Sequence, residues 1–218
     1  MKVAIVVNSS WAAYNFRLNL AKSIKNQGYK VIFIIPFDDK YSKKLQKYFE
    51  CYDLRINAMS TNPFADLKLL VNLFLTYKKI KPNIICHFTV KLNIYGSIAA
   101  RFCKIPNITN ITGLGTIFIH KSLLTFFVKK LYKFALFFSS ITFFQNKEDL
   151  TYFLSKKLII KSEAFLLPGS GVDLNKFKYS PLLKEKNTFK FLMISRLIKD
   201  KGIFEYIEAI RIIKKKYP

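Results

Sequence analysis

The feature that most constrains the fold of this chain is a regular alternation of short strand-like runs with helical segments. Parallel strands are usually joined by a crossover helix, so strands that alternate with helices predict parallel pairing. We therefore predict an α/β fold with a doubly wound, Rossmann-like parallel sheet. The predicted strands are residues 3–7, 30–35, 53–57, 84–88, 107–111, 141–144 and 164–167.

Helices are expected between these strands. Gly28 is a C-terminal stop for a first helix that ends near Asn26, and Pro63 stands in the first turn of a later one. The predicted helices after the first are residues 41–49, 63–79, 95–103, 122–139 and 147–154.

The end of the chain repeats the pattern once more. Residues 189–194 are predicted to form a buried strand, followed by a basic turn with Arg196 and Lys201 and then a helix. One strand and one helix cannot bury their own apolar faces, so this unit indicates the start of a second sheet. We therefore expect an N-terminal domain over residues 1–183 and a truncated start of a second domain over residues 184–218.

The charge of the chain points to an anionic partner. Its 37 Lys and Arg residues against 13 Asp and Glu give a formal net charge of +24. Nucleic acid, acidic lipid head groups and phosphorylated substrates all fit such an excess, and so does a surplus of solvated lysines without function. The sequence has no nucleic-acid recognition motif, so we expect no nucleic-acid partner.

Cysteine usage and the N-terminus bear on the compartment. Cys51, Cys86 and Cys103 are widely spaced, which is typical of a reducing cytosol and not of a disulfide framework. The sequence has no metal-ligand spacing, and the apolar run at residues 3–7 is too short for a signal peptide.

Residues 122–139 form a basic amphipathic segment. Phe127 and Phe134 fall on an apolar helical face, whereas Lys129, Lys130 and Lys133 fall on the opposite face. Lysines inside the run exclude a membrane-spanning helix, but such a helix can lie in a membrane interface or pack as an ordinary core-facing helix. Both interpretations stay open at this point.

Short motifs along the chain have a recognisable order. They are Tyr14-Asn-Phe-Arg17, Gly28-Tyr-Lys-Val31, Lys91-Leu-Asn-Ile-Tyr-Gly96, Gly113-Leu-Gly115, Phe144-Gln-Asn146 with Asp149, Pro168-Gly-Ser-Gly-Val-Asp173, and Ser195-Arg-Leu197 with Lys201-Gly202. In this order they resemble the family 4 glycosyltransferases of the GT-B type, which have two Rossmann-like domains. The resemblance is strongest to bacterial enzymes of polysaccharide and lipid-linked glycan assembly, including N-acetylgalactosaminyltransferases.

The resemblance implies roles for residues on both sides of an inter-domain cleft. Arg196 and Lys201 match the pair that neutralises the diphosphate of the nucleotide sugar as the glycosidic bond breaks. Gly113 and Gly115 match the loop that borders the cleft. The family's acidic pair, two Glu separated by seven residues, is absent from this sequence.

The remaining implied positions lie nearer the acceptor. Ser9, Ser10 and Tyr14 match the acceptor-side loop, where some relatives have glycines. Lys91 matches a basic position near the cleft, from which it could meet an acceptor diphosphate, although a solvated lysine fits equally well. His87 ends a predicted strand, is expected to point toward the cleft, and is the candidate catalytic residue.

The implied function is hexosyl transfer. The resemblance implies a retaining hexosyltransferase that moves a hexose or hexosamine from a UDP-sugar, a nucleotide sugar, to a polyprenyl-diphosphate-linked glycan, with no bound metal or other cofactor. Work at the inner face of the cell membrane, peripheral and cytoplasmic, would bring the protein to an anionic membrane surface. The alternative is a catalytically inactive, truncated protein that only binds membrane or glycan.

Overall fold

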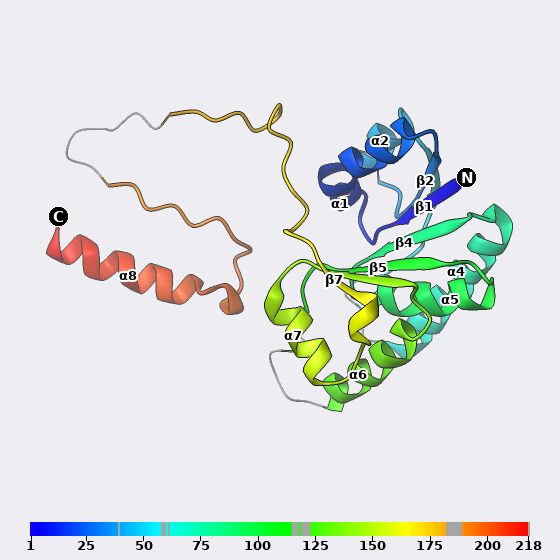
Figure 1. The fold of residues 1–218 in the computed structure, drawn as a ribbon. Helices are drawn as coiled ribbons and strands as arrows, with labels where there is room; N and C mark the ends of the chain where they lie inside the picture. The colour runs from blue at the N-terminus through cyan, green and yellow to red at the C-terminus, as the bar shows by residue number, and fades with distance from the viewer. Residues whose placement is uncertain are drawn as a thin grey trace. The chain divides into compact units, whose positions relative to one another are not determined.

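Two compact units make up the described part of the chain. The computed structural model describes residues 1–38, 40–57, 60, 62–114, 118, 123–181 and 189–217. The first unit is Met1–Phe177 and the second is Lys178–Pro218 (Figure 1). Each is described by itself below.

A seven-stranded sheet with the order β3-β2-β1-β4-β5-β6-β7 forms the centre of the first unit, and all its printed strand pairs are parallel. The chain builds β2 and β3 on one side of β1 and then returns to place β4 on the other side, so the strand order reverses between β1 and β4. This confirms the predicted doubly wound sheet. The strands are β1 (Lys2–Val6), β2 (Lys30–Ile35), β3 (Glu50–Asp53), β4 (Ile84–Phe88), β5 (Asn107–Ile111), β6 (Ile141–Phe144) and β7 (Ala164–Leu166).

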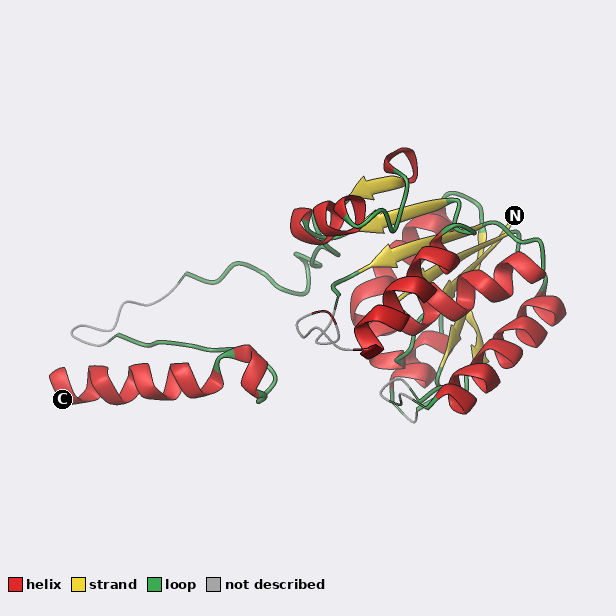
Figure 2. Cartoon of the chain, turned by 90° about the horizontal axis from the view of Figure 1, so that it is seen from below, coloured by secondary structure: helices red, strands yellow, loops and turns green. Residues whose placement is uncertain are grey.

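Helices cover the sheet (Figure 2). Two of the connections contain a π-helical turn, η1 after β1 and η2 after β4, and each turn runs directly into an α-helix. The helical elements of this unit are α1 (Ser10–Ala12), η1 (Ala13–Arg17), α2 (Leu18–Asn26), α3 (Tyr41–Gln46), α4 (Pro63–Ile80), η2 (Leu92–Gly96), α5 (Ser97–Phe102), α6 (Leu123–Leu136), α7 (Lys147–Ser155) and the 3₁₀ turn η4 (Lys161–Glu163).

Alternate residues of the central strands pack into separate hydrophobic clusters. Ala4 and Val6 of β1 belong to a cluster with Leu73 and Tyr77 of α4, whereas Ile5 lies in the cluster that includes Ala13, Ala21 and Leu45. This is the period of two expected for a strand that is buried on both faces. The sheet therefore has α4 and α5 on one face and η1, α2 and α3 on the other.

One predicted strand is shifted along the sequence. The prediction placed it at residues 53–57, but β3 begins at Glu50, where its register pairs Glu50 with Ile32 of β2. The Lys30 ammonium lies 2.7 Å from a Glu50 carboxylate oxygen beside this pairing. Tertiary pairing thus overrides the local signal, as is common for short edge strands.

The second unit holds the 3₁₀ turn η5 (Lys199–Lys201) and helix α8 (Ile203–Lys216). The predicted strand at residues 189–194 is wrong for this structure, since these residues lie outside any strand. Phe189 is 92% exposed and Ile194 is 87% exposed. A strand needs a neighbour to accept and donate its backbone hydrogen bonds, and among the described residues no strand pairs with this run. The Tyr206 hydroxyl of α8 donates to the Phe191 carbonyl.

Candidate functional site

Polar side chains gather where the parallel strands of the first unit end. Open α/β sheets bind ligands at this carboxyl edge, next to the point where the strand order reverses. Here that point lies between β1 and β4. The loops that leave the edge carry Ser9 and Ser10 after β1, Thr89 and Lys91 after β4, Gly113 after β5, Gln145 after β6, and Ser170 after β7.

The loop after β1 starts the helical run. The Ser9 side chain accepts a hydrogen bond from the backbone N–H of Ala12, which caps α1. The Ser10 hydroxyl donates to Asp38 Oδ2 at 2.5 Å. Burial alone raises the pKa of Asp38, but hydrogen bonds from Ser10, Tyr41 and Ser42 lower it below its ordinary value. Both serines therefore have structural partners, and their role in acceptor binding stays a prediction.

Tyr14 lies on the same turn but is only half-buried. Its ring lies 5.8 Å from the ring of Tyr41, and the ammonium of Lys44 lies 5.4 Å from its centroid. A half-buried aromatic ring at this edge can pack against an apolar or sugar face.

His87 lies inside the domain. The structure corrects the expectation that it points toward the cleft, because its ring is completely buried between α4 and η2. Its Nε2 atom is 2.9 Å from the Tyr77 hydroxyl, and a Cβ added to Gly96 would lie 2.5 Å from the ring. Burial lowers the pKa of His87 to about 3, since a charged imidazolium would lose its hydration there. A catalytic role for His87 stays a prediction.

Lys91 is held by an ion pair. Its ammonium lies 2.6 Å from Asp66 Oδ1 and also donates to the Asn57 carbonyl. The Tyr95 hydroxyl donates to the other oxygen of Asp66 at 2.9 Å. Both charged side chains are about 15% exposed, so neither is a freely solvated group. The structure thus ties the loop after β4 to the start of α4 through this pair.

Gly113 leaves the end of β5 with a φ of +148°, a conformation that L side chains rarely adopt. A Cβ at this position would meet nothing within 4 Å, so backbone conformation and not space favours glycine there. Gly115, its predicted partner, lies outside the described residues.

Arg17 was not among the predicted site residues. It closes η1, is only 8% exposed, and its guanidinium carbon lies 4.1 Å from the centroid of the Phe88 ring at the end of β4. Nη1 donates to Ser170 Oγ at 3.0 Å and to the Phe16 carbonyl at 3.4 Å. One sequence signal marks it, because Ala13, Arg17 and Ala21 stand four residues apart on one buried helical stripe.

The loop after β7 returns to the first helices. Besides the Arg17 contact, Asn19 donates to Asp173 and the Lys176 ammonium donates to Asn15. Gln145 donates to Ser170 Oγ at 2.9 Å and to Asn110 Oδ1 at 3.2 Å. Three motifs that are far apart in the sequence, at residues 14–17, 144–146 and 168–173, therefore meet at this edge.

The two cations of the second unit lie in an exposed turn. Arg196 and Lys201 are both exposed, and the Lys201 N–H donates to the Ile198 carbonyl. Gly202 follows with a φ of +72° and leads into α8. The predicted order of basic turn and helix is present, whereas diphosphate binding by these two residues stays a prediction.

The outer face of α6 differs from the predicted one. Tyr132, Ala135 and Leu136 are the residues that face the core, whereas Phe127 is 61% exposed and Phe134 is 55% exposed. Lys130 and Lys133 are exposed beside these rings, and the Lys129 ammonium lies 5.3 Å from the Tyr152 ring centroid. The apolar face predicted from the sequence is thus two faces, one in the core and one in solvent.

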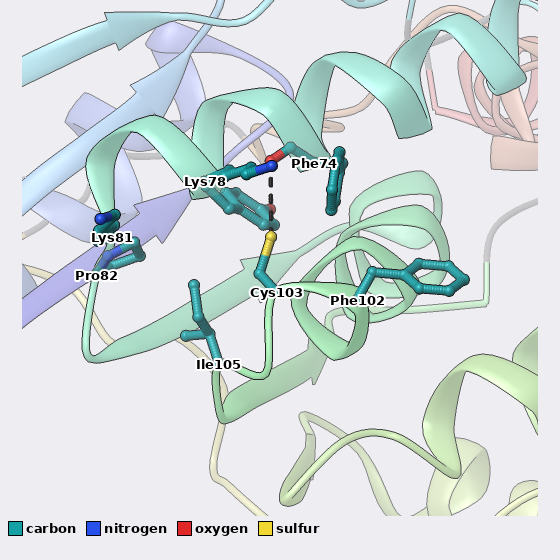
Figure 3. Close-up of a pocket in the computed structure, with 8 residues that line it drawn as sticks. Phe74, Lys78, Lys81, Pro82, Phe102, Cys103 and Ile105 are labelled. Atoms are coloured by element: carbon teal, nitrogen blue, oxygen red, sulfur yellow. Dashed lines mark hydrogen bonds between the residues drawn. The ribbon is translucent and has the colours of Figure 1, made fainter.

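A depression of about 430 Å³ lies at the opposite, amino edge of the sheet, near the starts of β4 and β5 (Figure 3). Phe74, Lys78, Phe102 and Cys103 are among the residues that line it, and the Cys103 thiol donates to the Phe74 carbonyl at 3.6 Å. Burial raises the pKa of this thiol, which keeps it protonated and a poor nucleophile. Neither its position nor its chemistry matches the carboxyl-edge site.

The family follows from a sequence match over most of the first unit. The profile described as glycosyl transferase 4-like matches residues 2–146, two thirds of the chain. This chain belongs to the glycosyl transferase 4-like family. The matched range covers β1 to β6 and the loops at their carboxyl ends, so the resemblance inferred from the motifs is confirmed.

This glycosyl transferase 4-like chain is also similar in sequence to a curated relative. It is 26% identical over 183 residues to the N,N'-diacetylbacillosaminyl-diphospho-undecaprenol alpha-1,3-N-acetylgalactosaminyltransferase of Campylobacter jejuni. The match covers 81% of this chain and 48% of the relative. The chain thus spans about half the length of the curated relative that it matches.

Solved structures agree on the fold. A glycosyltransferase from Rickettsia africae matches with a TM-score of 0.61 and 18% identity, over 81% of this chain and 45% of that one. Anabaena HepE with UDP and glucose matches at 0.57 and 15%, over 83% and 47%, and S. aureus MnaA with UDP at 0.61 and 16%, over 85% and 49%. At these identities the likeness concerns the fold, and the predicted α/β, Rossmann-like fold of the GT-B type is confirmed for the seven-stranded sheet.

Among the described residues, no helix is both long and apolar enough to cross a bilayer.

Proposed function

We propose that this chain provides the acceptor-binding half of a retaining glycosyltransferase. The enzyme moves a hexose or hexosamine from a UDP-sugar to a polyprenyl-diphosphate-linked glycan. The observation that carries the proposal is the family match over residues 2–146, because it covers the whole carboxyl edge of the sheet up to β6. The Campylobacter relative, whose name states a diphospho-undecaprenol-linked acceptor, supports the acceptor class.

Arg196 and Lys201 supply the charge that the leaving group needs. Breaking the bond between sugar and diphosphate places negative charge on the diphosphate, and fixed cations stabilise that charge in the transition state. In this proposal the two side chains take the place of a metal ion, so no cofactor is required.

The outer face of α6 brings the enzyme to its lipid-linked acceptor. Phe126, Phe127 and Phe134 are exposed there beside Lys130 and Lys133, and α6 contains no acidic residue. Exposed aromatic rings among lysines suit an anionic membrane surface, since the rings enter the interface and the ammonium groups meet the head groups. In this proposal the protein works at the inner face of the cell membrane.

Acceptor binding and turnover test the proposal separately. We expect the 218-residue chain to bind a short-chain polyprenyl-diphosphate-linked N-acetylhexosamine in calorimetry, and to transfer no sugar from a panel of radiolabelled UDP-sugars. Failure to bind the acceptor would contradict the acceptor role. Measurable transfer by this chain alone would contradict the proposed division between two halves.

Liposome flotation tests the membrane surface. The chain should float with vesicles that contain anionic lipid, and binding should weaken as salt rises. The double variant Phe127→Ser with Phe134→Ser should lose most of this binding. The control Phe64→Ser changes an exposed ring on α4 and should bind as the wild type does. Binding that is indifferent to lipid charge and to the double variant rules the surface out.

A further inference from the structure

Arg17 is a buried cation without an acidic partner. It is 8% exposed, and no carboxylate of the described residues forms an ion pair with it. Buried charges in proteins are normally paired, because an unpaired charge keeps the full cost of lost hydration. Burial accordingly lowers the pKa of Arg17 to about 10, still far above neutral pH, so the side chain remains charged.

The groups around Arg17 are rich in hydrogen-bond donors. Ser170 Oγ accepts from Arg17 Nη1 and from Gln145 Nε2, so donors from two different elements converge on one oxygen atom. A guanidinium has five N–H donors, and among the described residues only Nη1 of Arg17 has acceptors. An excess of donors around a fixed positive charge is the environment that a phosphate oxygen prefers.

The position in the fold supports the same conclusion. Arg17 lies over Phe88, the last residue of β4, and therefore at the point where the strand order reverses. The next residue, Thr89, has a φ of +79°, and its buried hydroxyl has no hydrogen-bond partner among the described residues. A β-branched residue in the left-handed region is strained, and such strain concentrates at functional sites.

We propose that Arg17 binds a phosphoryl group of the acceptor diphosphate, with Ser170 and Gln145 beside it as polar contacts. This assignment rests on the proposed function for the identity of the ligand. It also moves the acceptor's anion contact away from Lys91, because the Lys91 ammonium is already paired with Asp66.

Inorganic pyrophosphate serves as the first probe, titrated into the 218-residue chain by calorimetry. Arg17→Gln should weaken binding about tenfold or more, the size expected for a lost charge-assisted hydrogen bond. Arg17→Lys keeps the charge but loses the planar guanidinium. Its affinity for pyrophosphate should therefore lie between those of the wild type and Arg17→Gln. Arg101→Gln is the matched control, since Arg101 also lies over an aromatic ring, that of Phe138, but on α5. Equal affinity in wild type and Arg17→Gln overturns the proposal.

A measurement on the wild type covers the case in which Arg17→Gln fails to fold. The Nε–Hε signal of Arg17, assigned in ¹⁵N spectra by its loss in Arg17→Lys, should shift during the pyrophosphate titration while that of Arg101 stays in place. An unmoved Arg17 signal at saturation overturns the site. Farnesyl diphosphate should compete for the same site, whereas competition by UDP but not by farnesyl diphosphate overturns the assignment to the acceptor.

The lipid-linked acceptor separates the two proposals. If Arg17→Gln binds it as tightly as the wild type does, the Arg17 site is wrong and the acceptor role survives. If pyrophosphate binding depends on Arg17 but the chain does not bind the acceptor, the anion site survives and the proposed function is wrong.

Discussion

The two units of this chain begin with a similar sequence pattern but differ in the structure that this pattern adopts. Each has an apolar run that leads through a polar turn into a helix, at residues 2–17 in the first unit and 189–216 in the second. In the first unit the run becomes β1, and its residues Ala4, Ile5 and Val6 are completely buried. In the second, Phe189 and Ile194 are almost fully exposed.

The difference shows what makes an apolar run into a strand. β1 has β2 on one side and β4 on the other, so its backbone groups are hydrogen-bonded, and a hydrophobic cluster covers each of its faces. Residues 189–194 have no paired strand among the described residues. The same local pattern therefore gives a buried, paired strand in one unit and an exposed run outside any strand in the other.

The largest expected effect compares one phenylalanine from each unit. Phe33 of β2 is completely buried, so Phe33→Ala should lower the free energy of unfolding by about 3–5 kcal/mol. Phe191→Ala should change it by less than about 0.5 kcal/mol, because this ring is already exposed. Urea unfolding followed by circular dichroism measures both. A cost for Phe191→Ala that approaches that of Phe33→Ala would show that the second unit packs as the first does.

Breaking one ion pair in each unit should repeat this comparison with smaller changes in the free energy of unfolding. Asp66→Asn breaks a largely buried pair with Lys91 and should cost about 1–3 kcal/mol of unfolding free energy. Glu208→Gln breaks an exposed pair with Arg211 on α8 and should cost less than about 0.5 kcal/mol. Chemical denaturation at low and high salt provides the test. Equal costs for the two variants would contradict the contrast in burial.

The pH dependence of stability should belong to the first unit. The pKa of His87 in the folded chain, about 3, lies below its ordinary value of 6.5, so the unfolded chain takes up the proton first. Above about pH 6.5, His87 therefore does not reduce the free energy of unfolding. Its titration lowers that free energy by up to about 1.4 kcal/mol per pH unit as the pH falls toward 3. Unfolding measured between pH 5 and 7.5 should show this slope in wild type and a shallower one in His87→Gln. An unchanged slope in the variant refutes the assignment.

Much of the first unit was predictable because its signals are local. The strands at residues 30–35, 84–88, 107–111 and 141–144 have the predicted bounds, since each combines β-forming residues with a clear turn. The bounds of β3 were not predicted correctly, and the single apolar face expected for residues 122–139 is divided between the core and solvent. Register and helix rotation depend on neighbouring elements, which periodicity alone does not identify.

The site was predictable in place but only partly in composition. Residues after strand ends were expected at the carboxyl edge, and Ser9, Ser10, Lys91 and Gly113 lie there. The partner of each side chain was not predictable, because Asp38 and Asp66 come from distant segments. Arg17 was not predicted, because a charged residue within an apolar stripe does not by itself identify its partners. Phe88 and Ser170, which contact its guanidinium, come from distant segments.

Gly96 lies so close to His87 that the side chains allowed at these two positions depend on each other. Any side chain at position 96 would overlap the imidazole, so a methyl group there requires a smaller group at position 87. In a collection of homologous sequences these two columns should change together. Gly96→Ala alone should lower the stability of the fold. A second substitution that makes residue 87 smaller should restore much of the lost stability.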